Sequence, residues 1–245
     1  MRNVAALVLA AGKGTRMYSD LAKVLHPICG RPMLSYVLAA LGELRLARVL
    51  VVVGHQAEDI QKIFAEARVE WVLQGEQLGT GHAVFCALPH LADSAGSVIV
   101  CCGDTPLLTA KTLRMFLTAH VNSKNDLSVL SMFLEEPGTY GRIVRNSAGE
   151  VTGIVEAKDA TGKERDIREV NTGIYCVGGE LLHDVIPKIR NANVQGEFYL
   201  TDMIQLAAKG GWKVQAVAGS NPTEFMGVNT KEELQEAARV IAQRL

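Results

Sequence analysis

The sequence predicts an α/β fold in which a mostly parallel sheet is extended by a smaller, strand-rich lobe. In the first half of the chain, apolar runs typical of strands covered on both faces alternate with helices. After about Asn125 strands follow one another with few long helices, which indicates a mixed sheet. No Ser- or Pro-rich linker separates residues 1–125 from 126–228, so we expect two halves of one domain, followed by a C-terminal helix within 229–245.

Apolar periodicity and Gly or Pro punctuation define the individual elements. We expect strands at 3–9, 49–53, 69–73 and 98–102, and then at 127–133, 142–144, 151–156, 169–177 and 212–217. Helices are expected at 33–44, 58–67, 83–88 and 181–189, and from Leu200 and Lys231 onward. Thr230 and Glu233 have the spacing of a capping box at the start of the last helix.

Composition excludes several classes of protein. The 245 residues include 25 Lys and Arg against 26 Asp and Glu, so no basic surplus points to nucleic acid or to an anionic membrane. The chain starts without a signal peptide and holds no apolar run near the ~20 residues that span a bilayer, so we expect a cytoplasmic protein. Five cysteines without paired spacing predict neither disulfides nor a zinc site.

The first strand leads directly into a glycine-rich basic turn, residues 12–16, which we call the first glycine turn. Gly12 and Gly14 permit backbone angles that a Cβ atom would forbid, so successive amides can line one concavity while Lys13 and Arg16 add positive charge. This composition suits a polyphosphate. It is not a Walker loop, because no Gly-Lys-Ser/Thr closes a stretch with four residues between glycines, and it is not a dinucleotide fingerprint, because Met17 replaces the third glycine. A plain strand-to-helix connection remains the alternative.

Three further features point to the same edge of the sheet. Asp104 follows the buried strand 98–102, and ligands of parallel sheets gather outside the carboxyl ends of strands. We therefore favour a metal ligand over a helix cap for Asp104. Lys23 lies in an open segment just beyond the first glycine turn, and residues 75–83, the second glycine turn, offer free amides at the start of a helix.

This set of residues fits phosphoryl or nucleotidyl transfer with Mg²⁺. Cations around phosphate and one or two oxygen ligands for a hard cation are what that chemistry requires. No Ser-His-Asp set and no histidine cluster is present, and His82 is interpreted as a loop or cap residue. A phosphate nucleophile, with its second pKa of ~6, is already anionic near neutrality and needs no protein base.

Taken together, the motifs resemble those of the sugar-1-phosphate nucleotidyltransferases, and most closely the uridyltransferase domain of the bifunctional N-acetylglucosamine-1-phosphate uridyltransferases/glucosamine-1-phosphate acetyltransferases. The resemblance covers nearly the whole chain in order. Its motifs are 9–17 with Lys23, Gln74 with 77–83, 103–104, 140–143, 154–156, 171–173, 196–202 and 227–229.

The resemblance implies a Rossmann-like doubly wound core and transfer of uridylyl from UTP to N-acetylglucosamine 1-phosphate, with Mg²⁺ as cofactor. By position, Arg16 and Lys23 would be catalytic, and Asp104 and Asn229 would bind the metal. The nucleotide-binding residues would be Leu9, Ala10, Ala11, Gly12, Gly14, Lys23, Gln74, Gly79, Thr80 and Asp104. The sugar-binding residues would be Gly141, Glu156, Asn171, Tyr199 and Thr201.

Two departures limit what the resemblance implies. Ala22 precedes Lys23 where many relatives have proline, which could loosen that loop. No hexapeptide repeats of an acetyltransferase domain occur, so acetyl transfer is not predicted, the associated trimer loses its support, and a monomer is compatible with the sequence. Alternatives are another pair of substrates, such as glucose 1-phosphate or dTTP, or a regulator that binds nucleotide sugars without turnover. A nicotinamide-dependent oxidoreductase is disfavoured by the absent third glycine.

Overall fold

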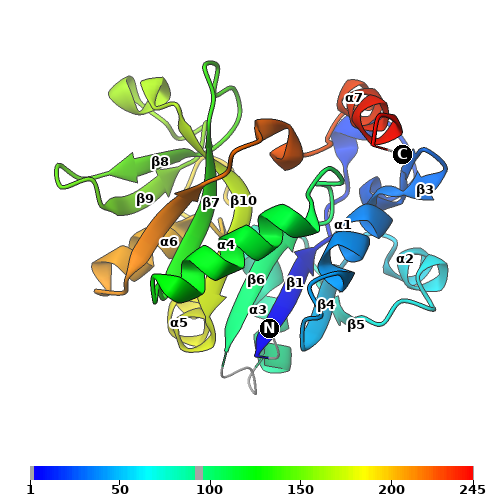
Figure 1. Cartoon of the computed structure of the whole chain (residues 1–245), viewed down its shortest axis with the longest axis horizontal. Coiled ribbons are helices and arrows are strands. Elements are labelled where there is room, and N and C mark those ends of the chain that lie inside the picture. Colours follow the sequence, from blue (N-terminus) through cyan, green and yellow to red (C-terminus); the bar gives the residue numbers. More distant parts are fainter. Residues whose placement is uncertain (1–2, 92–95, 245) are drawn as a thin grey trace.

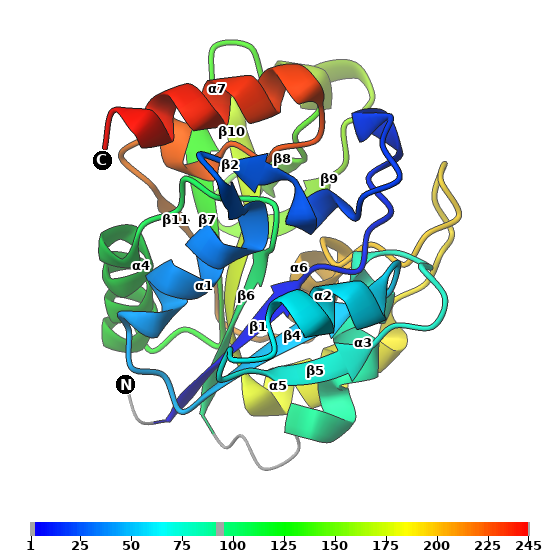
Figure 2. The same cartoon turned by 90° about the vertical axis from the view of Figure 1, so that its right-hand side faces the viewer.

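A twisted sheet of nine strands forms the centre of the molecule, with helices on both faces (Figures 1 and 2). The computed structural model describes residues 3–91 and 96–244. The main path of the sheet has the strand order β11-β7-β10-β6-β1-β4-β5, and β8 and β9 extend it beside β10. This mixed α/β architecture confirms the predicted fold class.

Four strands of the first half run parallel, as their unbroken apolar sequences predicted. β1 lies between β6 and β4, and β5 follows β4 at the edge. Both faces of β1, β4 and β6 are largely covered, so these strands lack the alternation of polar and apolar residues typical of a half-exposed strand, whereas the edge strand β5 is partly exposed. Their bounds are Val4–Leu9 for β1, Arg48–Val53 for β4, Glu70–Leu73 for β5 and Ser97–Cys102 for β6.

The second half adds antiparallel pairing to this sheet. β10 pairs antiparallel with β6, β7 and β8, and β8 and β9 form an antiparallel pair that projects from the sheet (Figure 1). β11 returns parallel to β7 at the far edge. The bounds are Leu127–Phe133 for β7, Arg142–Arg145 for β8, Val151–Val155 for β9, Glu169–Gly178 for β10 and Val214–Ala218 for β11.

Two apolar clusters form the core, one on each face of the sheet. The first lies beneath α3 (Thr80–Leu91), α5 (Gly179–Val185) and α6 (Asp202–Lys209). The second lies beneath α1 (Met33–Gly42), α2 (Ala57–Ile63) and α4 (Ala110–Asn122). In the described part of the chain, no helix is both long enough and apolar enough to cross a membrane.

A third, smaller cluster attaches the last helix above the carboxyl ends of the parallel strands. α7 (Lys231–Ala242) packs against β2 (Pro27–Ile28), which pairs with β3 (Arg31–Pro32). The predicted capping box of Thr230 and Glu233 is confirmed. This arrangement brings the start of α7 to the edge where the first glycine turn lies (Figure 2).

Several boundaries differ from the predictions. α3 begins at Thr80 rather than at residue 83, because Gly81 continues the helix instead of preceding it. The helix expected at 181–189 ends at Val185 and continues as a 3₁₀ turn over Ile186–Lys188, while α6 begins at Asp202 rather than at residue 200. Among the helices and strands of the described residues, α4 and the short strands β2 and β3 are entirely absent from the predicted elements.

We expect α4 to be essential for stability. Phe116 on its inner face is fully buried in the core, so Phe116→Ala should lower the free energy of unfolding by about 3–5 kcal/mol. The neighbouring Met115 is 40% exposed, and Met115→Ala should change the free energy of unfolding by only about 0.5 kcal/mol. Urea unfolding of both variants measures the difference, and equal effects would contradict the packing of α4.

Candidate active site

The main cavity, of about 380 Å³, opens at the carboxyl ends of β1 and β6. All ten residues predicted to bind nucleotide line it, which are Leu9, Ala10, Ala11, Gly12, Gly14, Lys23, Gln74, Gly79, Thr80 and Asp104. The structure thus brings both glycine turns and Asp104 to one edge of the sheet, as predicted. A broader depression of about 620 Å³ lies elsewhere, between α4 and Glu43, and contains none of these residues.

The two glycines of the first turn serve different purposes. Gly14 has a φ angle of +66°, and a Cβ atom there would lie 2.6 Å from the Cβ of Lys23, so glycine lets that lysine pack against the turn. Gly12 lies outside the left-handed region and has no neighbouring atom within 4 Å of a Cβ position. The expectation of unusual backbone angles is therefore wrong for Gly12, whose missing side chain instead leaves space in the cavity.

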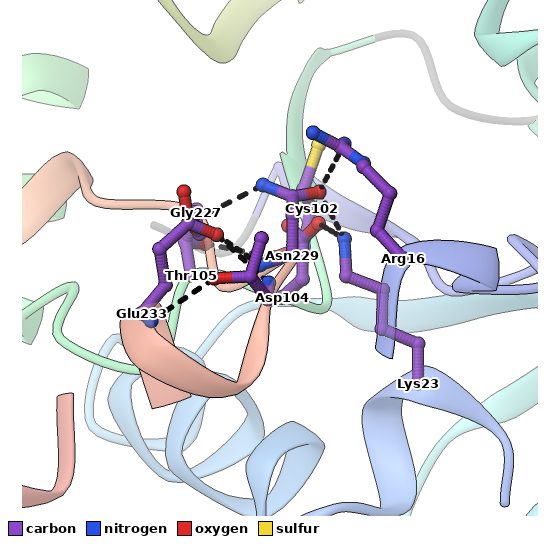
Figure 3. A network of polar contacts seen from close by, with 9 residues as sticks. Arg16, Lys23, Cys102, Asp104, Thr105, Gly227, Asn229 and Glu233 are labelled. Carbon is purple, nitrogen blue, oxygen red and sulfur yellow. Dashed lines mark hydrogen bonds and ion pairs between the residues drawn. The ribbon is translucent and has the colours of Figure 1, made fainter. Parts of the chain in front are cut away.

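Four side chains, which we call the cationic cluster, meet beside this turn (Figure 3). The Nζ atom of Lys23 donates hydrogen bonds to a carboxylate oxygen of Asp104 and to Oδ1 of Asn229, the latter at 2.6 Å. Arg16 donates to the same Oδ1 atom at 2.9 Å. Two cations thus face one carboxylate and one amide, and this surplus of positive charge suits an anionic ligand.

The start of α7 holds Asn229 in the cationic cluster. The carboxylate of Glu233 accepts hydrogen bonds from the main-chain N–H groups of Asn229, at 2.6 Å, and of Thr230, at 3.0 Å. The N–H of Val228 donates to the carbonyl oxygen of Asp104 at 2.8 Å. Figure 3 shows Glu233 on one side of Asn229, with Arg16 and Lys23 on the other. The cap of the helix and the site therefore share the same residues.

The second glycine turn joins the two halves of the chain. Gly79 has a φ angle of +116°, and a Cβ atom there would lie 2.6 Å from the carbonyl oxygen of Phe198. That oxygen accepts a hydrogen bond from the N–H of Gly81 at 2.7 Å, and the hydroxyl of Thr80 accepts one from the N–H of Leu200 at 3.1 Å. The glycines thus allow residues 198–200 to pack against this turn, and the preceding Glu197 lines the cavity.

The residues predicted to bind sugar gather in a second cluster. The hydroxyl of Thr201 donates to Glu156 at 2.9 Å, and a Cβ atom on Gly141 would lie 3.4 Å from the other oxygen of that carboxylate. The N–H of Asn171 donates to the carbonyl oxygen of Gly141 at 2.8 Å. Tyr199 lies near enough to Glu156 for that carboxylate to act on its ionisation. All five predicted residues are therefore neighbours in the fold.

Burial and negative charge dominate this second cluster. Burial raises the pKa of Glu156, and the nearby carboxylates of Asp159 and Asp202 raise it further. Burial together with the same acidic surroundings raises the pKa of Tyr199 to about 12. A carboxyl group kept from water with few partners is poorly solvated in the free protein, so it is available to hydroxyl or amide donors of a ligand.

Some residues of the cavity are not among those predicted. The additional lining residues are Lys13, Thr15, Val24, Gln77, Ala83, Cys102 and Glu197. Cys102 lies directly before Gly103 and Asp104, and this position was a signal that it reaches the same edge of the sheet as Asp104. Glu233 was expected only as a capping residue, and its spacing from Asn229 gave no sign of a contact with that residue.

Comparisons with known proteins agree with this geometry. Residues 6–166 match the family model described as a MobA-like NTP transferase domain. Curated relatives include the bifunctional protein GlmU of Pelobacter propionicus, 49% identical over 100% of this chain and 54% of the relative. The GlmU proteins of Trichlorobacter lovleyi and Bacillus licheniformis are 50% and 47% identical over 98% of this chain, which covers 53% and 52% of them. The chain thus spans about half the length of these relatives.

We expect Glu156 to destabilise the free protein. Its folded-state pKa lies above its ordinary value of 4.5, so stability is lost as pH rises from that value through the folded pKa. Glu156→Gln should therefore raise the melting temperature at pH 7, and this gain should disappear at about pH 4, where the unfolded carboxyl group is also largely protonated.

Thermal unfolding at the two pH values measures this effect. Glu76→Gln, which changes an exposed carboxylate in the second glycine turn, is the matched control and should alter the melting temperature little. A Glu156→Gln variant that melts below the wild type at pH 7 would contradict the inferred cost of burial.

Proposed function

Since the chain belongs to the family of MobA-like NTP transferase domains, we propose that it transfers uridylyl from UTP to N-acetylglucosamine 1-phosphate, forming UDP-N-acetylglucosamine and pyrophosphate. The observation that carries the proposal is the cationic cluster at the mouth of a glycine-lined cavity. The motif resemblance across both halves of the chain supports the choice of uridine and of an amino sugar.

In this mechanism Arg16 and Lys23 bind the triphosphate and neutralise the charge that develops on the attacked α-phosphate. The sugar phosphate is already anionic, so the protein supplies alignment rather than a general base. Its oxygen attacks the α-phosphorus, and pyrophosphate leaves from the opposite side. The first glycine turn contributes backbone N–H groups and, at Gly12, open space for the phosphates.

The donor set of the cationic cluster fits Mg²⁺. An oxygen of Asp104 and Oδ1 of Asn229 both contact the Nζ atom of Lys23, so two oxygen ligands already converge on the position of a cation. Two protein oxygens are typical for Mg²⁺, which completes its shell with water and phosphate oxygens. When bound, the ion would offset the negative charge of the phosphates. Asp104 and Asn229 would hold it, and Lys23 would then be free to contact phosphate.

The remaining predicted residues divide between the two substrates. Gln74 and the second glycine turn would bind the uracil base, and Thr80 would lie near the ribose. Glu156, Gly141, Asn171, Tyr199 and Thr201 would bind the sugar, with the poorly solvated carboxylate accepting from its hydroxyl or amide groups.

Turnover can be measured directly. Incubation of the protein with UTP, N-acetylglucosamine 1-phosphate and Mg²⁺ should release pyrophosphate, and removal of the metal with a chelator should stop the release. A panel with glucose 1-phosphate and dTTP identifies the preferred pair. Release with none of these sugar phosphates would refute the proposal and favour a regulator that binds without turnover.

The metal assignment depends on Asp104. Asp104→Ala removes one of two protein oxygens, so turnover should fall by about a thousandfold or more, and the affinity of the protein for Mg²⁺ with UTP should weaken. The control is Asp20→Ala, which changes an exposed carboxylate in the loop between the first glycine turn and Lys23 and should retain activity. Unchanged turnover in Asp104→Ala would refute the metal assignment.

A further inference from the structure

Gln74 is a buried polar residue, and both hydrogen-bond partners of its side-chain amide contact the amide nitrogen. Only 3% of the residue is exposed, and it lines the main cavity. Its Nε2 atom lies 3.1 Å from the carbonyl oxygen of Gly79 and 3.0 Å from Nδ1 of His82. A carbonyl oxygen can only accept, so the amide nitrogen, not the amide oxygen, must face Gly79.

The contact with His82 then fixes the tautomer of that histidine. One Nε2 hydrogen of Gln74 points to Gly79 and the other to Nδ1 of His82, so Nδ1 must carry a lone pair. The ring hydrogen therefore lies on Nε2 of His82, which faces the sulfur of Cys86 at 3.8 Å. The ring also has two aromatic neighbours, with its centroid 6.4 Å from that of Phe85 and 6.2 Å from that of Phe198.

This arrangement leaves the amide oxygen of Gln74 for a ligand. Within residues 3–91 and 96–244 it has no hydrogen-bond donor, and both hydrogens of its amide nitrogen are already used. The main-chain N–H groups of Ala11 and Gly79 line the same cavity and likewise have no acceptor among those residues. The cavity thus presents one fixed acceptor together with N–H donors.

We propose that His82 is a positioning residue that locks the Gln74 amide with its oxygen toward the base, and that this lock selects uracil over cytosine. Uracil offers an N3–H donor between two carbonyl oxygens, which matches an acceptor accompanied by donors. Cytosine has an unprotonated N3 and would bring two acceptors together. Without Nδ1 as an acceptor, only the carbonyl oxygen of Gly79 would still hold the amide nitrogen, so rotating the amide to present its nitrogen would break one hydrogen bond instead of two. The inference rests on the proposed use of a uridine nucleotide.

The test compares kcat/KM for UTP and CTP in the full chain. His82→Phe keeps an aromatic ring beside the two neighbours but removes the acceptor, so the preference for UTP should fall by about tenfold or more. His82→Asn places an amide oxygen close to the original Nδ1 position and should restore much of the preference. Cys86→Ala alters only the side of the His82 ring that carries Nε2, so this variant should retain the preference for UTP.

Two outcomes would overturn the inference. His82→Phe could keep the full preference for UTP, or Cys86→Ala could lose as much preference as His82→Phe does. A measurement without any variant is the ¹⁵N spectrum of the wild-type histidines, in which His82 should be the Nε2–H tautomer. A hydrogen on Nδ1 would refute the lock even if His82→Phe did not fold.

Equilibrium binding of UTP and CTP separates this inference from the proposed function. Preferential binding of UTP that is lost in His82→Phe, in a protein without turnover, would support the lock and refute the enzymatic proposal. If the protein turns over UTP and His82→Phe keeps the preference for UTP over CTP, the enzymatic proposal is supported and the lock is refuted.

Discussion

Lys23 lies between Asp104 and Asn229, and this contact joins three segments that are distant in the sequence. The side chain of Lys23 is 12% exposed and that of Asp104 is 22% exposed, so the charges are only partly solvated and gain from facing each other. Arg16 adds a second cation to the amide oxygen of Asn229. The local charge is therefore positive, which suits an anionic ligand.

The surrounding elements are arranged so that this contact can form. Gly14 leaves room for the stem of Lys23, and β6 ends where it delivers Asp104 to the same edge. α7 completes the arrangement, because Val228, Ala237 and Ile241 pack in the small apolar cluster that also contains Ile28 of β2. Packing of α7 thus sets the position of the Asn229 side chain in the cationic cluster.

The sequence predicted most of the sheet because strands covered on both faces are unbroken apolar runs. α4 was missed although Leu113, Phe116, Leu117 and His120 have helical spacing and Thr109 caps the helix, so the signal was present. The lining of the main cavity was largely predictable from the two glycine turns, since the strands that precede them end at one edge of the sheet. The contacts of Glu233 with Asn229 and of His82 with Gln74 could not be predicted from the sequence. Each depends on which atom of the neighbouring residue lacks another hydrogen-bond partner.

The contact between Lys23 and Asn229 spans 206 positions of the chain, and that between Arg16 and Asn229 spans 213. During synthesis on a ribosome, the first glycine turn and Asp104 emerge long before the residue that completes their cluster. The parallel half of the sheet can therefore assemble while Lys23 has only Asp104 as a partner. Closing so long a loop is entropically costly, and the cluster is complete only after Asn229 has left the exit tunnel.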